Sequence, residues 1–298
     1  MLVDSGMSEV NKIVASKNKL GVKYRRPLNE QQVTVLHSLY WYRFCTSKQL
    51  AVALKKANHK AIQNKLQILE DQQLVSKRYD KSYKLAGRPA EYFITSKSAR
   101  ALEKAKPNTT NTWANKSLYK NKTVSDDFVK HCIAIRETGI RLFDLYSEPG
   151  AHKLQRITKT YMVQFSEYPT WTPDLYLQYH PTKNTTQHYF LDIWDGTKPF
   201  FVTVRKTQNY VKFKEEGEWQ EDTPFPAILA ICEDKRAQTK LNRQMKRILS
   251  DAWDDELIFA TTTKQLLNEA TRPTDKIWSR IDTDDAEPTT LRGLTPVL

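Results

Sequence analysis

The spacing of apolar residues between positions 28 and 104 predicts three short helices followed by two short strands, and this order strongly constrains the fold. The first helix begins after Asn29, a favourable N-cap, and the second begins at Thr46, which opens a Thr-x-x-Gln capping box. The third helix places Ile62, Leu66 and Leu69 on one face. The chain therefore starts with a small, mainly helical module.

Two strands follow, over residues 74–79 and 91–94. A basic, turn-rich segment that includes Lys84, Gly87, Arg88 and Pro89 joins them. Three helices followed by a basic hairpin predict a winged helix-turn-helix. A further helix is expected after Thr95, where it closes the module or serves as a dimer arm.

The positive charge of the chain is concentrated in its first half. Residues 1–122 contain 24 Lys and Arg against 8 Asp and Glu, a balance of +16, whereas the remainder has 23 against 26, a balance of −3. Such an asymmetry favours a polyanionic partner for the N-terminal part, because neutralising phosphates releases counterions. Residues 1–27 are expected to form a basic flexible arm.

The third predicted helix has a polar stripe opposite its apolar face. Its amide side chains can bond bidentately to adenine in the major groove, and neighbouring lysines can hold phosphates. An alternative role for such a module is protein interaction. The predicted DNA-binding residues are Lys48, Lys55, Lys56, Lys60, Gln63, Asn64, Gln67, Lys84 and Arg88.

Composition and motifs exclude several classes of function. The chain has no apolar run long enough to span a bilayer, no P-loop, no dinucleotide-binding glycine motif and no serine-hydrolase elbow. Its three cysteines, Cys45, Cys132 and Cys232, lack metal-ligand spacing and are expected to be reduced core residues. We therefore expect a cytoplasmic protein without a bound cofactor.

The second half of the chain predicts an α-β-β-β-α-β order. A long amphipathic helix comes first, and then strands around residues 161–165, 175–177 and 189–194. A helix at about 199–214, a strand at 227–232, a basic helix at about 235–249, a short strand at 257–260 and a helix from Thr263 complete an α/β sheet. The expected domains are a winged helix over 28–106, a linker over 107–123, an α/β domain over 124–270 and a C-terminal tail over 271–298.

Two acids in this half are candidates for chemistry. Asp174 follows a proline at the start of one strand, and Asp192 lies within an otherwise apolar strand, where an unpaired charge costs several kcal/mol. The pattern resembles the PD-(D/E)xK nuclease fold. That resemblance implies that the two acids hold a divalent metal, usually magnesium, with a lysine two positions after the second acid.

Trp194 occupies the position of that lysine. Lys198 and Lys206 are the candidates to supply the charge from the following helix, and Glu137 could add a carboxylate. An active enzyme would be a Mg²⁺-dependent endonuclease using Asp174, Asp192 and Lys206. The alternative is that both acids make local hydrogen bonds, and we expect the domain to be inactive.

The motifs of both halves of the chain, taken together, indicate a family more specifically than the motifs of either half alone. A Gly-Arg-Pro wing, a Pro-Asp strand and the sequence Leu191–Thr197, followed by a helix containing Lys206 and Tyr210, resembles the plasmid replication-relaxation family over roughly residues 28–249. Where such proteins carry Glu-x-Asp in the third strand, this chain has Asp192-Ile193-Trp194. The resemblance implies a role in plasmid or conjugative-element replication and transfer, beside relaxase or replication proteins.

Together these features predict an α/β (α+β) protein with an N-terminal winged helix-turn-helix followed by a restriction-endonuclease-like α/β sandwich. We expect an accessory protein that docks double-stranded DNA, possesses no nuclease activity and could form a homodimer. Two alternatives stay open: the Mg²⁺-dependent endonuclease, and a winged-helix transcriptional repressor whose second domain dimerises or senses a ligand.

Overall fold

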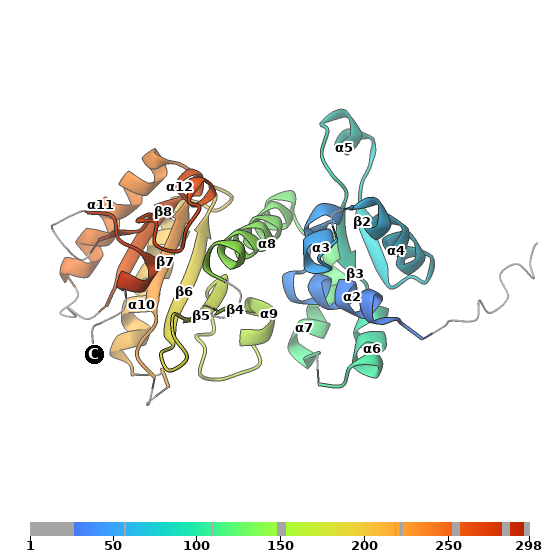
Figure 1. Ribbon diagram of the computed structural model, residues 1–298, viewed down its shortest axis with the longest axis horizontal. Helices are drawn as coiled ribbons and strands as arrows, with labels where there is room; N and C mark the ends of the chain where they lie inside the picture. The colour runs from blue at the N-terminus through green and yellow to red at the C-terminus, as the bar shows by residue number, and fades with distance from the viewer. Residues whose placement is uncertain are drawn as a thin grey trace, which may run out of the picture.

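A computed structural model describes the protein as two domains joined by one long helix (Figure 1). The described residues are 27–56, 58–108, 110–147, 153–217, 219–220, 223–251, 257–281 and 287–294. The predicted basic arm, apart from Pro27, lies outside them.

Three helices form the framework of the N-terminal domain: α2 (Glu30–Tyr42), α3 (Ser47–Ala53) and α4 (Lys60–Asp71). Both predicted capping motifs are present. Asn29 and Gln32 exchange side-chain and backbone hydrogen bonds at the start of α2, and Thr46 and Gln49 do the same at α3. Their apolar faces bury Val35, Leu50 and Leu66 among others in one core.

The hairpin of this domain consists of β2 (Val75–Arg78) and β3 (Glu91–Ile94), as the sequence predicts. A two-residue strand that was not predicted, β1 (Cys45–Thr46), pairs with the other edge of β3 and completes a three-stranded sheet. The tip of the hairpin holds a short helix, α5 (Lys81–Leu85), which projects away from the domain in Figure 1. These elements make a winged helix, which α6 (Ser96–Ala105) closes.

The predicted linker over 107–123 is mostly helical, which corrects the sequence interpretation. Its described part forms α7 (Thr112–Ser117) and the 3-10 helix η1 (Leu118–Lys122). Few apolar residues were visible in this segment, yet Ala114 and Leu118 are buried in the winged-helix core. Asn111 caps α7 by accepting a hydrogen bond from the Ala114 amide at 2.6 Å.

The C-terminal domain is built on a six-stranded sheet with the order β4-β5-β6-β7-β8-β9. Strands β4 (Lys153–Thr158), β5 (Leu175–His180) and β6 (Gln187–Trp194) are antiparallel, and β7 (Ala227–Cys232) and β8 (Phe259–Thr263) continue parallel to β6. Helix α8 (Asp126–Tyr146) packs on one face of the sheet. Helices α10 (Phe200–Glu215) and α11 (Lys235–Asp251) cover the other. Apart from a short helix between β4 and β5, the elements from α8 to β7 follow the predicted α-β-β-β-α-β order.

The first predicted strand of this domain is misplaced. Tyr161 belongs to the short helix α9 (Lys159–Met162), and the strand is β4, just before it. The alternation of Tyr161, Val163 and Phe165 resembles a strand, but the chain turns just after α9 and the rings of Tyr161 and Phe165 contact each other, with centroids 4.9 Å apart. Tyr161 also contacts Trp41 of the winged helix.

The segment after residue 270 is not a separate tail in its described part. After α12 (Lys264–Glu269), strand β9 (Ser279–Arg280) pairs with β8, and the 3-10 helix η2 (Leu291–Leu294) buries Leu291 and Leu294. Trp278 is fully buried and donates a hydrogen bond to the Tyr146 hydroxyl at 3.1 Å. Asp282, Asp284 and Asp285, which belong to the predicted tail, lie outside the described residues.

Helix α8 contacts both domains. Near its N-terminus, Val129 and Cys132 pack against Phe44 and Phe93 of the winged helix. The Gln49 side chain donates to the backbone carbonyl of Ile133 at 3.1 Å. The domains therefore share a packed interface along α8.

Among the described residues, no helix is long and apolar enough to cross a bilayer.

Candidate functional site

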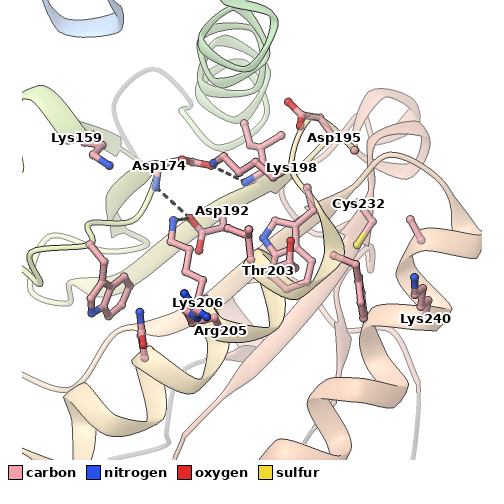
Figure 2. Close-up of a pocket in the computed structure, with 18 residues that line it drawn as sticks. Lys159, Asp174, Asp192, Asp195, Lys198, Thr203, Arg205, Lys206, Cys232 and Lys240 are labelled. Carbon is pink, nitrogen blue, oxygen red and sulfur yellow. Dashed lines mark hydrogen bonds and ion pairs between the residues drawn. The ribbon is translucent and has the colours of Figure 1, made fainter. Parts of the chain in front are cut away.

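A group of buried charges lies at the carboxyl end of β6. Asp174 immediately precedes β5, Asp192 is in β6 and Lys206 is in α10. Figure 2 shows these three residues meeting at the wall of a cavity of about 410 Å³. The structure thus brings together the three residues predicted from the sequence as candidate catalytic groups.

Asp192 is held by one cation and two neutral donors. Its side chain is only 2% exposed and forms an ion pair with the Lys206 ammonium. Its Oδ2 accepts from the Tyr210 hydroxyl at 2.8 Å, and its Oδ1 accepts from the Asp174 backbone amide at 3.1 Å. These contacts stabilise an acid that the apolar strand alone would disfavour.

Asp174 is tied to the same strand from the other side. Its Oδ2 accepts from the backbone amide of Ile193 at 2.9 Å, and its Oδ1 lies 3.1 Å from His131 Nε2. Local hydrogen bonds, the alternative considered from the sequence, therefore exist alongside the charged cluster. Burial raises the pKa of Asp174, but the charges of Lys206 and His131 outweigh it and hold that pKa well below its usual range.

His131 was missed by sequence reasoning and links two acids of the cluster. Its Nδ1 lies 2.9 Å from Asp195 Oδ2, while its Nε2 faces Asp174. Burial lowers the pKa of His131, but the charge of Asp174 and the hydrogen bonds to Asp174 and Asp195 outweigh burial and raise it to about 9. We assign the protonated form, in which both ring N–H groups donate to carboxylates.

Asp195 begins the loop that carries Lys198. Asp195 Oδ1 accepts from the amide and the hydroxyl of Thr197, at 3.1 and 2.6 Å, and these bonds close a turn over Asp195–Thr197. Gly196 in this turn has a φ of +73°, a backbone conformation that favours glycine. The turn directs Lys198 back toward the cluster, where its Nζ lies 3.1 Å from His131 Nε2 as a second positive charge that lowers the pKa of His131 without outweighing the acids.

Burial and neighbouring charge also shift the other groups of the cluster. Burial lowers the pKa of Lys206, but Asp192 and Asp174 outweigh it and raise that pKa. Burial, and then the negative charge of Asp192, raises the pKa of Tyr210 well above its usual value. Burial and the nearby Lys206 charge lower the pKa of Lys159, which lines the same cavity.

The donor set does not fit a divalent cation in this arrangement. All four carboxylate oxygens of Asp174 and Asp192 already accept from protein groups, and the nearest of these include Lys206 and His131, which are cationic. Asp174, Asp192 and Asp195 are balanced by His131, Lys198 and Lys206. Among the described residues, no group of three or more His, Cys, Asp or Glu side chains is arranged to hold a metal ion. A magnesium ion at these acids would compete with the protein's own donors for the same carboxylate oxygens.

Glu137, considered from the sequence as a further carboxylate, does not contribute to this site. It is exposed on α8 and is absent from the cavity wall. His131 lies six positions earlier on the same helix, on the buried face. A polar residue on that face was the one signal that could have identified it, because helical spacing places it beside Cys132 and Ile135 rather than with the solvent-facing acids.

The second candidate site is the outward face of α4. The predicted stripe of Lys60, Gln63, Asn64 and Gln67 is exposed, whereas Ile62, Leu66 and Leu69 on the opposite face are fully buried. Lys60 begins the helix, and its amide donates to the Asn58 side chain at 2.8 Å. Gln67 donates to Asp71 at 3.1 Å and remains exposed.

The other predicted DNA-binding residues fall into two groups. Lys48, Lys55, Lys56 and Lys84 are exposed. Arg88 instead supports the wing, because it forms an ion pair with Glu91 at 3.0 Å and its guanidinium lies 4.2 Å from the centre of the Tyr83 ring. Its role as a DNA contact stays a prediction.

All three cysteines are buried and free. Burial is the main cause that raises the pKa of each thiol to about 12. They therefore lack the exposed thiolate character of reactive cysteines.

The fold and the two sites define a class of protein in which a winged helix is joined through one long helix to an α/β domain with a buried acid-base cluster. The Replication-relaxation family model matches residues 36–228. The chain therefore belongs to the replication-relaxation family, as the sequence motifs indicated.

Solved structures similar to part of the chain are small winged-helix proteins. Wild-type ZitR of Lactococcus lactis in complex with DNA is 16% identical, with 43% of this chain and 90% of that chain covered and a TM-score of 0.22. The adhesin competence repressor AdcR of Streptococcus pyogenes is 16% identical, with 46% and 96% covered and a TM-score of 0.24. YusO of Bacillus subtilis is 13% identical, with 43% and 91% covered and a TM-score of 0.24. No curated protein showed significant similarity.

Proposed function

We propose that this protein is a DNA-binding accessory factor of plasmid or mobile-element replication and transfer, which docks duplex DNA through its winged helix. The outward face of α4 carries this proposal. Lys60, Gln63, Asn64 and Gln67 form one exposed row on a helix whose opposite face is fully buried. A helix presented in this way can enter the major groove with its side chains toward the base edges.

The charges around α4 support the same docking mode. Lys48 on α3, together with Lys55 and Lys56 after it, offers cations beside the helix, and Lys84 offers one on the wing. Amide side chains are suited to adenine, and lysines to the phosphates on either side of the groove. Binding should therefore combine a strong salt dependence with some preference for sequence.

The test is a gel-shift titration of the full chain on duplex DNA over a range of salt concentrations. Replacing Lys55 and Lys56 with alanine should lower the slope of log K against log salt by about 2, since each phosphate contact contributes about 0.9. Replacing Gln63 and Asn64 with alanine should instead reduce discrimination between sequences and leave that slope unchanged. Failure of the unmodified protein to bind any duplex in low salt would refute the proposal.

We assign the C-terminal domain a docking role without nucleolysis, in the cytoplasm, beside relaxase or replication proteins or a second copy of the chain. The charge balance of the buried cluster supports this assignment. Three acids face three cations, and the oxygens that would bind a metal already accept hydrogen bonds. The cluster then serves to fix β5, β6, α8 and α10 relative to one another.

A Mg²⁺-dependent endonuclease is the second candidate, because Asp174, Asp192 and Lys206 converge at one cavity. Incubation of supercoiled plasmid with the protein, with and without Mg²⁺ or Mn²⁺, decides between the two. We expect no nicked product beyond that of an Asp192→Ala variant. Nicking that requires the metal and is lost in the variant would establish the endonuclease instead.

A further inference from the structure

A row of basic side chains runs along the outer face of α11 and is not used by the proposed winged-helix docking. Arg236, Lys240, Arg243 and Arg247 are all exposed. Their spacing of four, three and four residues places them on one side of the helix, within about 16 Å along its axis. Leu241 and Met245 face the opposite way and are fully buried. We call the four basic residues the α11 stripe.

The composition of α11 differs from that of a helix face that merely contacts solvent. Lys235–Asp251 contains six Lys and Arg, and its only acid is the last residue. Surface helices usually intersperse charges of both signs, which form stabilising pairs three or four residues apart. Like charges at that spacing repel one another, so the stripe costs folding stability. The residues that follow Lys122 carry a net charge of −3 as a group, which makes this basic helix a local exception.

The stripe continues into the cavity of the candidate site. Lys240 lines that cavity together with Arg205 and Lys198, and Figure 2 shows Arg205 and Lys240 on the two helices that border it. Positive charge therefore extends from the surface of α11 to the cavity that holds Asp174 and Asp192. A chain of phosphates is the ligand chemistry that matches an extended row of cations leading to a cationic rim.

Aromatic groups in the cavity wall further restrict the class of ligand that fits. Trp171, Trp194 and Phe200 line it, and the Lys240 ammonium lies 4.0 Å from the centre of the Phe200 ring. Aromatic rings interleaved with cations are typical of surfaces that stack unpaired bases while holding the backbone. The cavity, of about 410 Å³, is of the size that holds small organic ligands and is too small for a duplex.

We propose that the α11 stripe and the rim of the adjoining cavity bind single-stranded DNA, as a second nucleic-acid surface separate from the winged helix. The stripe holds consecutive phosphates, and the cavity takes an unpaired base against its aromatic wall. This inference rests on the proposed DNA-binding function but uses different residues, so the two are separable by experiment.

The experiment measures binding of a fluorescently labelled oligo-dT strand to the full chain by anisotropy, over a range of salt concentrations. In the stripe variant, Arg236, Arg243 and Arg247 are replaced with alanine. The matched control replaces Lys183, Lys264 and Lys276, three exposed lysines elsewhere on the same domain. Each single-strand phosphate contact contributes about 0.7 to the salt slope, so the stripe variant should lose about 2 from it and bind about a hundredfold more weakly at 0.1 M salt.

Two further arms test the aromatic wall and the separation from the winged helix. Phe200→Leu keeps apolar bulk and removes the ring, and should weaken oligo-dT binding about fivefold or more. The stripe variant should bind duplex DNA as the unmodified protein does. The variant lacking Lys55 and Lys56 should retain oligo-dT binding.

The outcomes distinguish this inference from the proposed function. Oligo-dT affinity that is equal in the stripe variant and the unmodified protein overturns the α11 stripe as a binding surface, as does an equal loss in the control. A duplex competitor that displaces oligo-dT from the stripe as effectively as unlabelled oligo-dT overturns the commitment to a single strand. Duplex binding without oligo-dT binding refutes only this inference, whereas absence of both refutes the proposed function too.

Discussion

Replacing Lys206 with methionine should destabilise the C-terminal domain far more than loss of an ordinary surface lysine. Lys206 is the cation paired with Asp192, whose side chain is 2% exposed. After the substitution Asp192 keeps two neutral donors, the Tyr210 hydroxyl at 2.8 Å and the Asp174 amide at 3.1 Å, but no cation. Methionine is similar in length to lysine, so the change removes charge with little loss of volume.

The expected cost is about 3–5 kcal/mol in the free energy of unfolding, the range for removing one partner of a buried ion pair. For a domain of this size each kcal/mol lowers the melting temperature by about 2–4 °C, so the midpoint should fall by roughly 6–20 °C. Lys212→Met on the same helix is the matched control. Its side chain is 71% exposed and pairs with Glu216 at 3.3 Å, an interaction worth about 0–1 kcal/mol.

The assay is urea unfolding of the full chain followed by tryptophan fluorescence, since five of its seven tryptophans lie after residue 122. The Asp192→Asn variant and the double variant complete a thermodynamic cycle, which should give a coupling of about 1–3 kcal/mol. A cost for Lys206→Met within about 1 kcal/mol of the control would refute a charge-compensated buried cluster. Recovery of stability by Mg²⁺ in Lys206→Met would show that the acids accept a metal once the cation is removed, and would favour the endonuclease.

Three further predictions concern the cluster and the two cores. The pKa of His131 is raised from 6.5 to about 9, so its stabilising charge is fully present below pH 6.5 and is lost as the pH rises through 9. His131→Gln should abolish that part of the fall in unfolding free energy, and an unchanged pH profile would contradict the assigned protonation. Thr46→Ala removes the cap of α3 and should cost about 0.5–2 kcal/mol in winged-helix stability by thermal melting, while Thr46→Ser should be nearly neutral. Trp278→Ala should lower the free energy of unfolding of the C-terminal domain, measured in urea, by about 3–5 kcal/mol. An unchanged free energy of unfolding would show that the segment after residue 270 is not part of the core.

The sequence was sufficient to predict elements whose stabilising contacts lie between residues close together in the chain. The capping motifs at Asn29 and Thr46 identified two helix starts because both partners of each lie within one helical turn. The wholly apolar run Ala227–Cys232 identified a strand that is buried on both faces. In each case the physical cause acts over a few residues, so that one sequence shows it.

Elements that depend on distant partners could not be predicted in this way. Strand β1 has two residues and exists only because β3 pairs with it. Trp278 belongs to the core because Tyr146, 132 positions earlier, accepts its hydrogen bond. Alternation at Tyr161 resembled a strand although the contacts that fix its orientation come from Trp41, in the other domain. Local patterns do not record such tertiary contacts.

In the candidate site, too, some residues could be predicted from local sequence and others only from tertiary contacts. The sequence predicted a role for Asp192 because a charge within an apolar strand requires a partner. Lys206 was the predicted cation because it lies in the helix that follows this strand. His131 was not found, because it is 61 positions before Asp192 in sequence and its hydrogen bonds to the acids form only where α8 meets the end of the sheet. A buried polar residue on an amphipathic helix is therefore the signal to follow in similar chains.

Helix α8 holds the two proposed DNA surfaces, on α4 and on α11, in fixed positions relative to each other. Its first turns pack Val129 and Cys132 against the winged helix, and between these two residues His131 points to the acid cluster beside the cavity. A mobile linker would leave the two surfaces independent, with an effective concentration set only by its length. A shared packed helix instead allows only those DNA paths that reach both surfaces together. Duplex bound at α4 and a single strand held along α11 would then require a junction between paired and unpaired DNA. A forked substrate should therefore bind more tightly than its duplex or single-stranded arm alone, and equal affinity for all three would show that the surfaces do not act on one DNA molecule.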